Sequence, residues 1–275
     1  MFKIYDLNMK EIPFPDGVIP LEIFVGSVGK ERAIDTVDGR PGVVDYGFNY
    51  TDRPVSLFLR IKAADKIDFR LLRNEVFATF DVGSAFYVAE SDVPSRVLKV
   101  VVDESYIPDR LTEEYADFDI NCRTLDSVFW ESKYTTLELH DSGYAHSAEK
   151  YGLVDNIDDE KVQYRFTSNN FTVYNAGNVT VEPESMMLNI IVNAVQSDNN
   201  FTIRNKTTGE EIVLKRASAG SHFRIQGMVI SLGSITNVFR DTNRRFISLA
   251  PGDNQFEILN GTFEEIRFEF KFLYK

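Results

Sequence analysis

The sequence predicts a mainly β protein made of two β-sandwich domains, the first of which carries a single helix. Three observations lead to this fold class. Apolar and polar residues alternate in several segments, short turn motifs separate these segments, and one stretch alone has helical spacing. Successive side chains of a β-strand leave on opposite faces, so a segment with period-two alternation is expected to form a strand with one buried face.

Alternation is clearest in three segments, at 55–62, 116–122 and 266–274. Turn motifs rich in Gly, Pro, Asp and Asn occur at 38–42, 208–209 and 251–254. The pattern therefore predicts short strands joined by tight turns. The residues expected on the buried faces are Val55, Leu57, Leu59 and Ile61, then Ala116, Phe118, Ile120 and Cys122, and finally Ile266, Phe268, Phe270, Phe272 and Tyr274.

One helix is predicted at 65–80. Its apolar residues fall at i, i+3, i+7 and i+11, which places them on one stripe of a helix. Asp65 stands where a capping residue belongs, and Asp68 adds a negative charge to the first turn, where the helix dipole favours it. We expect this helix to pack across a sheet of the first domain. The stripe consists of Phe69, Leu72, Val76 and Phe80.

The predicted domains span residues 1–132 and 133–275. The strand pattern of the first half ends at Phe129 and Trp130, and a polar stretch with the acidic run 155–161 follows. Low hydrophobicity and like charge are typical of a linker, so 133–163 is expected to be a polar connecting segment. The remainder has strand after strand with short turns, which favours a second sandwich.

Composition excludes several classes of function. With 42 acidic against 30 basic residues, the net charge is −12, so stable binding to nucleic acid is not expected, because phosphates require clustered Lys and Arg. Cys122 is the single cysteine, which excludes an internal disulfide framework and a multi-cysteine zinc site. No apolar run approaches the roughly 20 residues of a membrane helix, so membrane insertion is not expected.

The sequence offers no candidate for a catalytic, metal or cofactor site. His140 and His146 are six residues apart, a spacing that does not place two ligands on one helix face. The apolar face of its predicted strand makes Cys122 a buried thiol rather than a nucleophile. Nucleophile-elbow and phosphate-loop motifs are missing from the chain. The expected protein is not an enzyme and needs no cofactor.

The order of motifs across nearly the whole chain resembles the distal tail protein family of long-tailed bacteriophages. In the first half, the Asp-Gly-Arg-x-Gly turn at 38–42 precedes the strand at 55–62 and the helix at 65–80, and Phe129-Trp130 closes the domain. In the second half, the motifs at 175–178 and 181–183 are followed by a strand at 188–192, the hairpin at 208–209, the segment 246–254 and the strand 268–274.

This resemblance implies a non-enzymatic structural protein of the tail tip, made in the host cytoplasm and carried in the virion. Members of the family form a hexameric ring that joins the tail tube to tail-fibre or receptor-binding proteins. The first domain would form the ring. The second would be a galectin-like sandwich that holds the peripheral host-recognition proteins. The expected partners are thus other copies of the chain, the tail tube protein and tail-associated proteins.

The strands beside the turn at 38–42 are the candidates for contacts between subunits. A ring uses heterologous interfaces, and an exposed strand edge can extend a sheet from one subunit to the next. The candidate residues are Asp38, Gly39, Arg40 and Gly42. The alternative is an ordinary surface hairpin.

Two other functions remain open from the sequence alone. A host-surface adhesin that binds a saccharide or receptor would need an exposed aromatic platform within 165–275. A hydrolase of cell-wall polymer would need a cleft with two opposed carboxylates, and none can be identified among 42 acidic residues.

Overall fold

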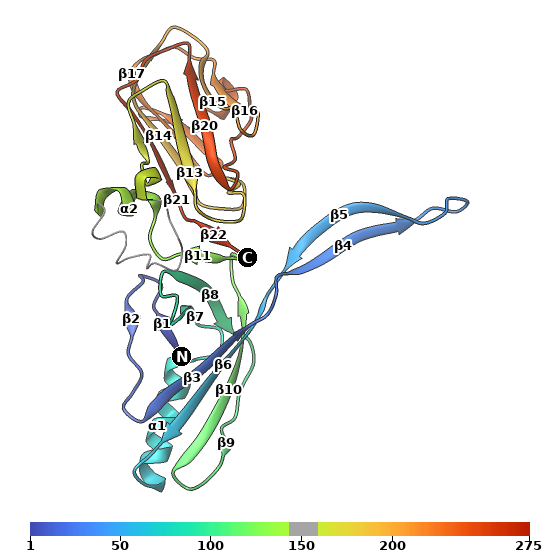
Figure 1. Cartoon of the computed structure of the whole chain (residues 1–275), viewed down its shortest axis with the longest axis vertical. Helices are drawn as coiled ribbons and strands as arrows, with labels where there is room; N and C mark the ends of the chain where they lie inside the picture. Colours follow the sequence, from blue (N-terminus) through green and yellow to red (C-terminus); the bar gives the residue numbers. More distant parts are fainter. Residues whose placement is uncertain (143–158) are drawn as a thin grey trace. The chain divides into compact units, whose positions relative to one another are not determined.

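A computed structural model describes residues 1–142 and 159–275 and confirms a mainly β protein with several sheets (Figure 1). The chain divides into two compact units. The first contains Met1–Trp130 with Lys275, and the second contains Glu131–Tyr274. This division falls close to the boundary expected from the sequence. That the two parts fold independently stays a prediction.

The first unit contains one strongly curved antiparallel sheet in the order β2-β1-β7-β8-β10-β6-β3. The short β9 pairs with β10, and β1 also lies close to β3, so the two ends of the sheet approach each other. The strands are β1 (Phe2–Tyr5), β2 (Glu11–Ile12), β3 (Val18–Val25), β6 (Pro54–Lys62), β7 (Ala85–Glu90), β8 (Arg96–Val102), β9 (Asp109–Arg110) and β10 (Tyr115–Thr124).

Alternation in β6 and β10 produces the core of this sheet. The four apolar residues predicted to face inward in each strand are all buried, while the residues between them are more exposed. Continuous pairing joins the two strands from Arg123 opposite Pro54 to Tyr115 opposite Lys62. The prediction of one buried face is therefore confirmed for both strands.

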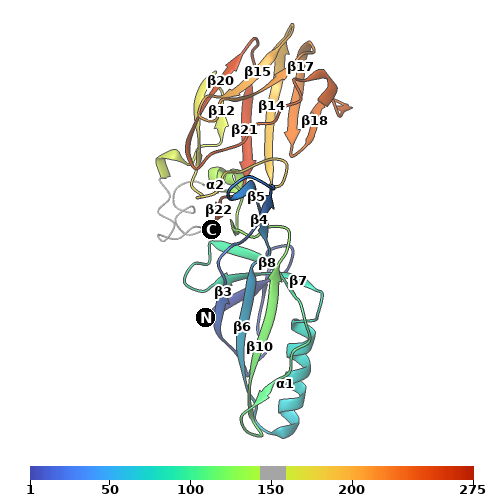
Figure 2. The same ribbon diagram turned by 90° about the vertical axis from the view of Figure 1, so that its right-hand side faces the viewer.

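The predicted helix is α1 (Lys66–Thr79), which lies along the sheet (Figure 2). The carboxylate of Asp65 accepts hydrogen bonds from the amides of Ile67 and Asp68 at 2.7 and 2.9 Å, as a capping residue does. The apolar stripe is buried, and its last member, Phe80, packs edge-on against Phe86.

Two strands of the first unit stand apart from this sheet. β4 (Gly29–Thr36) and β5 (Val43–Thr51) form a two-stranded antiparallel sheet of their own, which we call the arm. Figure 1 shows the arm extending away from the other strands of the first unit.

The second unit is a sandwich of two sheets, ordered β12-β21-β14-β17-β18-β19 and β13-β20-β15-β16 (Figure 2). Its strands are β11 (Trp130–Ser132, which begins in the first unit), β12 (Arg165–Phe166), β13 (Asn170–Asn175), β14 (Leu188–Ser197), β15 (Phe201–Asn205), β16 (Glu210–Leu214), β17 (Ser218–Gln226), β18 (Val229–Leu232), β19 (Ile235–Thr236), β20 (Gly252–Leu259), β21 (Glu265–Phe270) and β22 (Leu273–Tyr274).

Aromatic rings fill the space between the two sheets. Phe268 of β21 contacts Phe256 of β20 with ring centroids 4.9 Å apart, and Phe171 of β13 lies 5.8 Å from Phe268. Phe268 and Phe270 are both fully buried, as the alternation predicted. The core of the second unit is thus built around β21.

The prediction of one strand through 266–274 is wrong at its end. β21 ends at Phe270, and the chain then leaves β14 to pair with β11, where the Phe272 carbonyl accepts from the Ser132 amide at 2.8 Å. Phe272 and both residues of β22, Leu273 and Tyr274, are buried. Because these three consecutive side chains are all buried, burial no longer alternates between 272 and 274, as it would in a strand with one buried face.

The prediction of a polar connecting segment at 133–163 is wrong for its first residues. They form the short helix α2 (Thr136–Ser142), which begins with a capping box in which the Thr135 amide donates to Glu138 at 2.7 Å. Thr136 donates to the Phe268 carbonyl at 2.9 Å and accepts from the Phe270 amide at 3.1 Å, and Leu139 is buried. At the other end, 159–161 form a single 3₁₀ turn.

Candidate subunit interface and ligand pocket

The four predicted interface residues lie in the turn that joins β4 to β5 at the tip of the arm. Gly39 and Gly42 have positive φ angles of 82° and 87°, a backbone region that other residues adopt at a cost. The Arg40 amide donates to the Val37 carbonyl at 3.1 Å and closes the turn. Asp38, Gly39, Arg40 and Gly42 are all exposed, and their contact with another subunit stays a prediction.

The arm presents an apolar surface that the sequence analysis did not single out. Tyr46 is 67% exposed and Ile34 is 58% exposed, and Val37 and Val43 beside the turn are also exposed. Single exposed apolar residues are common, whereas several on one two-stranded projection are typical of a surface that associates with another molecule. The run Val43-Val44-Asp45-Tyr46 was the available signal in the sequence, because its apolar residues do not follow the period-two alternation of a strand with one buried face.

The base of the arm is held by aromatic contacts. The Lys30 ammonium lies 4.2 Å from the centre of the Phe48 ring, and Phe48 packs edge-on against Tyr50 at 5.3 Å. Tyr50 in turn contacts Phe129, which is buried in the body of the first unit. Arg32 pairs with Asp45 further along.

Arg53 fixes the chain where the arm rejoins the sheet. Its side chain is mostly buried and donates to the Gly26 carbonyl, while its amide donates to the Thr124 hydroxyl at 2.9 Å. Burial lowers the pKa of the Arg53 guanidinium from its ordinary value, because a charged group loses solvation there. Both strands of the arm are thereby anchored next to β6 and β10.

Groups with catalytic potential are dispersed. Within residues 1–142 and 159–275, no set of three or more His, Cys, Asp or Glu side chains is arranged to hold a metal ion. Burial raises the pKa of the Cys122 thiol to about 12, so the thiol is inert, as its position on the apolar face predicted.

The two histidines within the described residues have different partners. His222 on β17 contacts Asn193 at 3.0 Å, and His140 accepts from the Tyr164 amide at 3.5 Å. His146 lies outside the described residues. In the part of the chain that the structure describes, no helix is long and apolar enough to cross a lipid bilayer.

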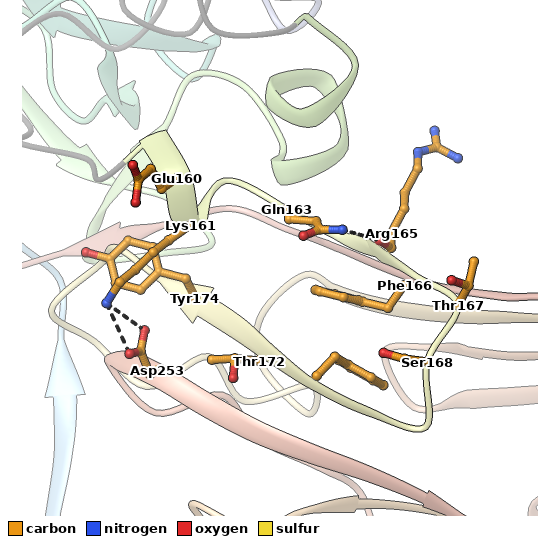
Figure 3. A pocket seen from close by; sticks show the side chains of 11 residues that line it. Glu160, Lys161, Gln163, Arg165, Phe166, Thr167, Ser168, Thr172, Tyr174 and Asp253 are labelled. Carbon is orange, nitrogen blue, oxygen red and sulfur yellow. Dashed lines mark hydrogen bonds and ion pairs between the residues drawn. The ribbon is translucent and has the colours of Figure 1, made fainter.

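A pocket of about 610 Å³ lies in the second unit beside β12 and β13 (Figure 3). At one end Lys161 pairs with Asp253 at 3.1 Å and overlies the ring of Tyr174 at 5.1 Å. The other lining residues are Glu160, Gln163, Arg165, Phe166, Thr167, Ser168, Phe171 and Thr172.

Comparison with known families matches residues 8–122 to the phage tail protein RIFT-related domain. Over these residues, the first unit is similar to a phage tail protein domain. The match covers β2 and β3, the whole arm, β6, α1, β7 to β9 and most of β10. It agrees with the family resemblance found in the motifs of the first half.

The fold of the whole chain is similar to that of the Dit protein (gp 19.1) of phage SPP1, described as a paradigm of the hub adsorption apparatus in phages that infect Gram-positive bacteria. The TM-score is 0.67 at 12% identity, over 99% of this chain and 100% of that one. The resemblance to the distal tail family is therefore confirmed in fold.

Chains in two structures of the phage p2 baseplate in its activated conformation, with Sr and with Ca, are more distant. Each has a TM-score of 0.44 and 11% identity over 98% of this chain and 97% of that one. Comparison with curated protein sequences gave no match.

Proposed function

We propose that this phage tail protein is the structural hub of a tail tip, and that it assembles as a hexameric ring through its first unit. The observation that carries the proposal is the arm. In a single subunit the side chains of Ile34 and Tyr46 are 58% and 67% exposed, so the hairpin leaves their apolar surface in contact with water. Burial against a neighbouring copy removes that apolar area from solvent.

A ring suits a projecting arm. In a ring each subunit contacts its neighbour through two different patches, so one copy's arm can lie on the body of the next around a closed circle. The outer edges of β4 and β5 also carry backbone groups that can pair with a strand of another chain. The turn at Asp38, Gly39, Arg40 and Gly42 would be the leading end of that contact.

The partners follow from the same proposal. The ring would stack on the tail tube protein, and the second unit would act as the galectin-like sandwich that holds tail-associated, fibre or receptor-binding proteins. The protein would be made in the host cytoplasm and reside at the tail tip of the virion, without enzymatic activity. The fold likeness to SPP1 Dit, at a TM-score of 0.67, supports this assignment.

Mass measurement tests the proposal. The full chain is examined by light scattering alone and after mixing with the tail tube protein of its phage, and a six-copy ring is expected in at least one case. The variant Val43→Asp/Tyr46→Asp should remain a single copy in both, with an unchanged circular dichroism spectrum.

A matched control is Ile107→Asp, which changes a residue 84% exposed in the first unit but outside the arm. It should assemble as the parent does. Single copies of the parent under both conditions, or normal rings of the arm variant, would show that the proposal is wrong.

A further inference from the structure

The pocket in the second unit lies at an open edge of the sandwich. β12 ends one sheet and β13 ends the other, so within residues 1–142 and 159–275 each has one side without a neighbouring strand of its sheet. We propose that this pocket binds a neutral saccharide. Ring assembly does not depend on the pocket, so this inference and the proposed function can each fail without the other.

The pairing of β13 determines which backbone groups meet the pocket. The Ile258 amide donates to the Asn169 carbonyl at 2.8 Å, and Asn170 stands opposite Glu257 in an antiparallel register. Hydrogen-bonded pairs alternate along such a ladder, so the backbone groups of Asn170, Thr172 and Tyr174 point away from β20.

The carbonyls at two of these three outward positions already accept hydrogen bonds. Ser168 donates to the Asn170 carbonyl at 2.9 Å, and Tyr164 donates to the Tyr174 carbonyl at 2.8 Å. Thr172, midway along this edge, is therefore the position that offers both a backbone amide and a backbone carbonyl to a ligand. The exposed Thr172 side chain adds a hydroxyl to the same wall.

The uncharged polar side chains of the wall carry hydroxyls and one amide. Thr167 and Ser168 lie in the β12–β13 turn, and Gln163 donates its amide to the Arg165 carbonyl at 3.3 Å, so its side-chain oxygen can still accept. Figure 3 shows these side chains along the pocket, with Asp253 at its end. Closely spaced donors and acceptors of this kind complement the hydroxyl groups of a sugar.

Aromatic surface supplies the apolar part of the site. Phe166 and Phe171 stack with ring centroids 4.4 Å apart and planes at 16°, and Tyr174 lies at the end of the pocket. Phe171 and Tyr174 are half-buried, so part of each ring faces the pocket. The apolar C–H groups of a sugar ring can pack on such surface while its hydroxyls bond to the wall.

The charges favour a neutral ligand. Of the basic residues in the lining, Lys161 is paired with Asp253, and Arg165 makes two hydrogen bonds to Asp141 at 2.9 and 3.1 Å. Figure 3 shows the guanidinium of Arg165 pointing away from the other labelled side chains. A phosphate or carboxylate would have to displace one of these pairs, whereas a neutral saccharide need not. The volume of about 610 Å³ lies in the usual range for ligand sites, roughly 300–1,000 Å³.

Saturation-transfer NMR on the full chain tests the inference. The probes are the neutral disaccharides cellobiose, lactose and chitobiose at millimolar concentration, with glucose and glucose 1-phosphate as an uncharged and charged pair for comparison. Transfer to at least one neutral disaccharide is expected, and glucose 1-phosphate should not bind more tightly than glucose. Thr172→Arg should weaken the binding by at least about tenfold, because it places a long side chain across the wall.

Ser234→Arg is the matched control, since it makes the same substitution at another exposed hydroxyl residue, in the turn between β18 and β19. Its binding should stay within about twofold of the parent, and melting curves should show both variants folded. Absence of transfer to every disaccharide, as expected if the edge takes an extended peptide, overturns the inference. So does transfer that Thr172→Arg leaves unchanged.

Discussion

The ring of Tyr50 packs edge-on against the ring of Phe129, with centroids 5.0 Å apart and planes at 80°. Tyr50 belongs to the arm, and Phe129 is buried near the end of the first unit's chain. Edge-to-face pairs of this kind stabilise by about 0.5–1.5 kcal/mol beyond simple burial. This contact therefore helps to fix the orientation of the arm relative to the rest of the first unit.

Removing this contact should loosen the arm without unfolding the unit. In Tyr50→Ala, amide hydrogen exchange measured by mass spectrometry should become faster in β4 and β5 and stay unchanged in β6 and β10. Tyr46→Ala, at a more exposed position of the same strand, serves as the control and should leave exchange as in the parent. Equal protection of the arm in both variants would show that the ring pair does not hold it.

Truncation of Phe268 should strongly destabilise the second unit. This side chain is fully buried and contacts Phe166, Phe171 and Phe256. Phe268→Ala should lower the free energy of unfolding by about 3–5 kcal/mol, measured by urea denaturation. Met228→Ala, which truncates an exposed residue, should change it by less than about 0.5 kcal/mol. A loss under about 1 kcal/mol in Phe268→Ala would contradict its place in the core.

The capping residue of α1 should make stability depend on pH. Hydrogen bonds from the amides of Asp68 and Ile67 hold the pKa of the Asp65 carboxyl below its usual value. Its contribution is therefore fully present above the unfolded pKa of about 3.9 and is lost as the pH falls through the lower folded pKa. The stability gap between the parent and Asp65→Ala should be widest near neutral pH and close in acid.

Asp65→Asn separates the charge from the cap, since asparagine can still accept from the two amides. It should retain most of the stability at neutral pH and lose the acid-dependent part. A gap between the parent and Asp65→Ala that is constant from neutral pH into acid would show that the carboxylate is not the cap.

The thiol of Cys122 should be unreactive while the protein is folded. With its pKa raised to about 12 by burial, Cys122 carries on the order of a thousandfold less thiolate at pH 8 than an ordinary cysteine. Iodoacetamide should add one alkyl group in denaturing urea and none in buffer, as read by intact mass. Rapid alkylation in buffer would mean that β10 opens.

The two units should fold separately. Each has its own buried core, and the division lies between Trp130 and Glu131. Fragments 1–130 and 131–275 should each unfold in one cooperative transition followed by circular dichroism. The full chain should show two such transitions, one for each unit. A fragment that lacks a cooperative transition would show that its core requires the other.

Strands with one buried face were predictable from the sequence because their physical pattern is local. In β6 and β10 every second residue faces the core, and α1 was marked by both its stripe and Asp65. The helix α2 was missed since only Leu139 and Thr136 are buried in it, too few for a stripe. The capping box from Thr135 to Glu138 was the signal available.

The candidate sites could be predicted only in part. The turn at 38–42 was recognised because Gly39 and Gly42 need positive φ angles. The projection of β4 and β5 away from the sheet could not be predicted. It depends on the absence of tertiary packing around these strands, and local alternation carries no information on that packing. The pocket brings Lys161, Tyr174 and Asp253 together from three elements, so sequence spacing carries no trace of it.

The arm also has a consequence for how this protein changes over time. Because its tip contributes little to the core, a substitution at Ile34, Val43 or Tyr46 costs the monomer little stability. In the proposed ring, selection on these positions would come from the surface that they contact rather than from folding. If the arm makes the proposed contact, related proteins can diverge in which neighbouring subunits they accept, one arm residue at a time, while the domain that carries the arm keeps its structure.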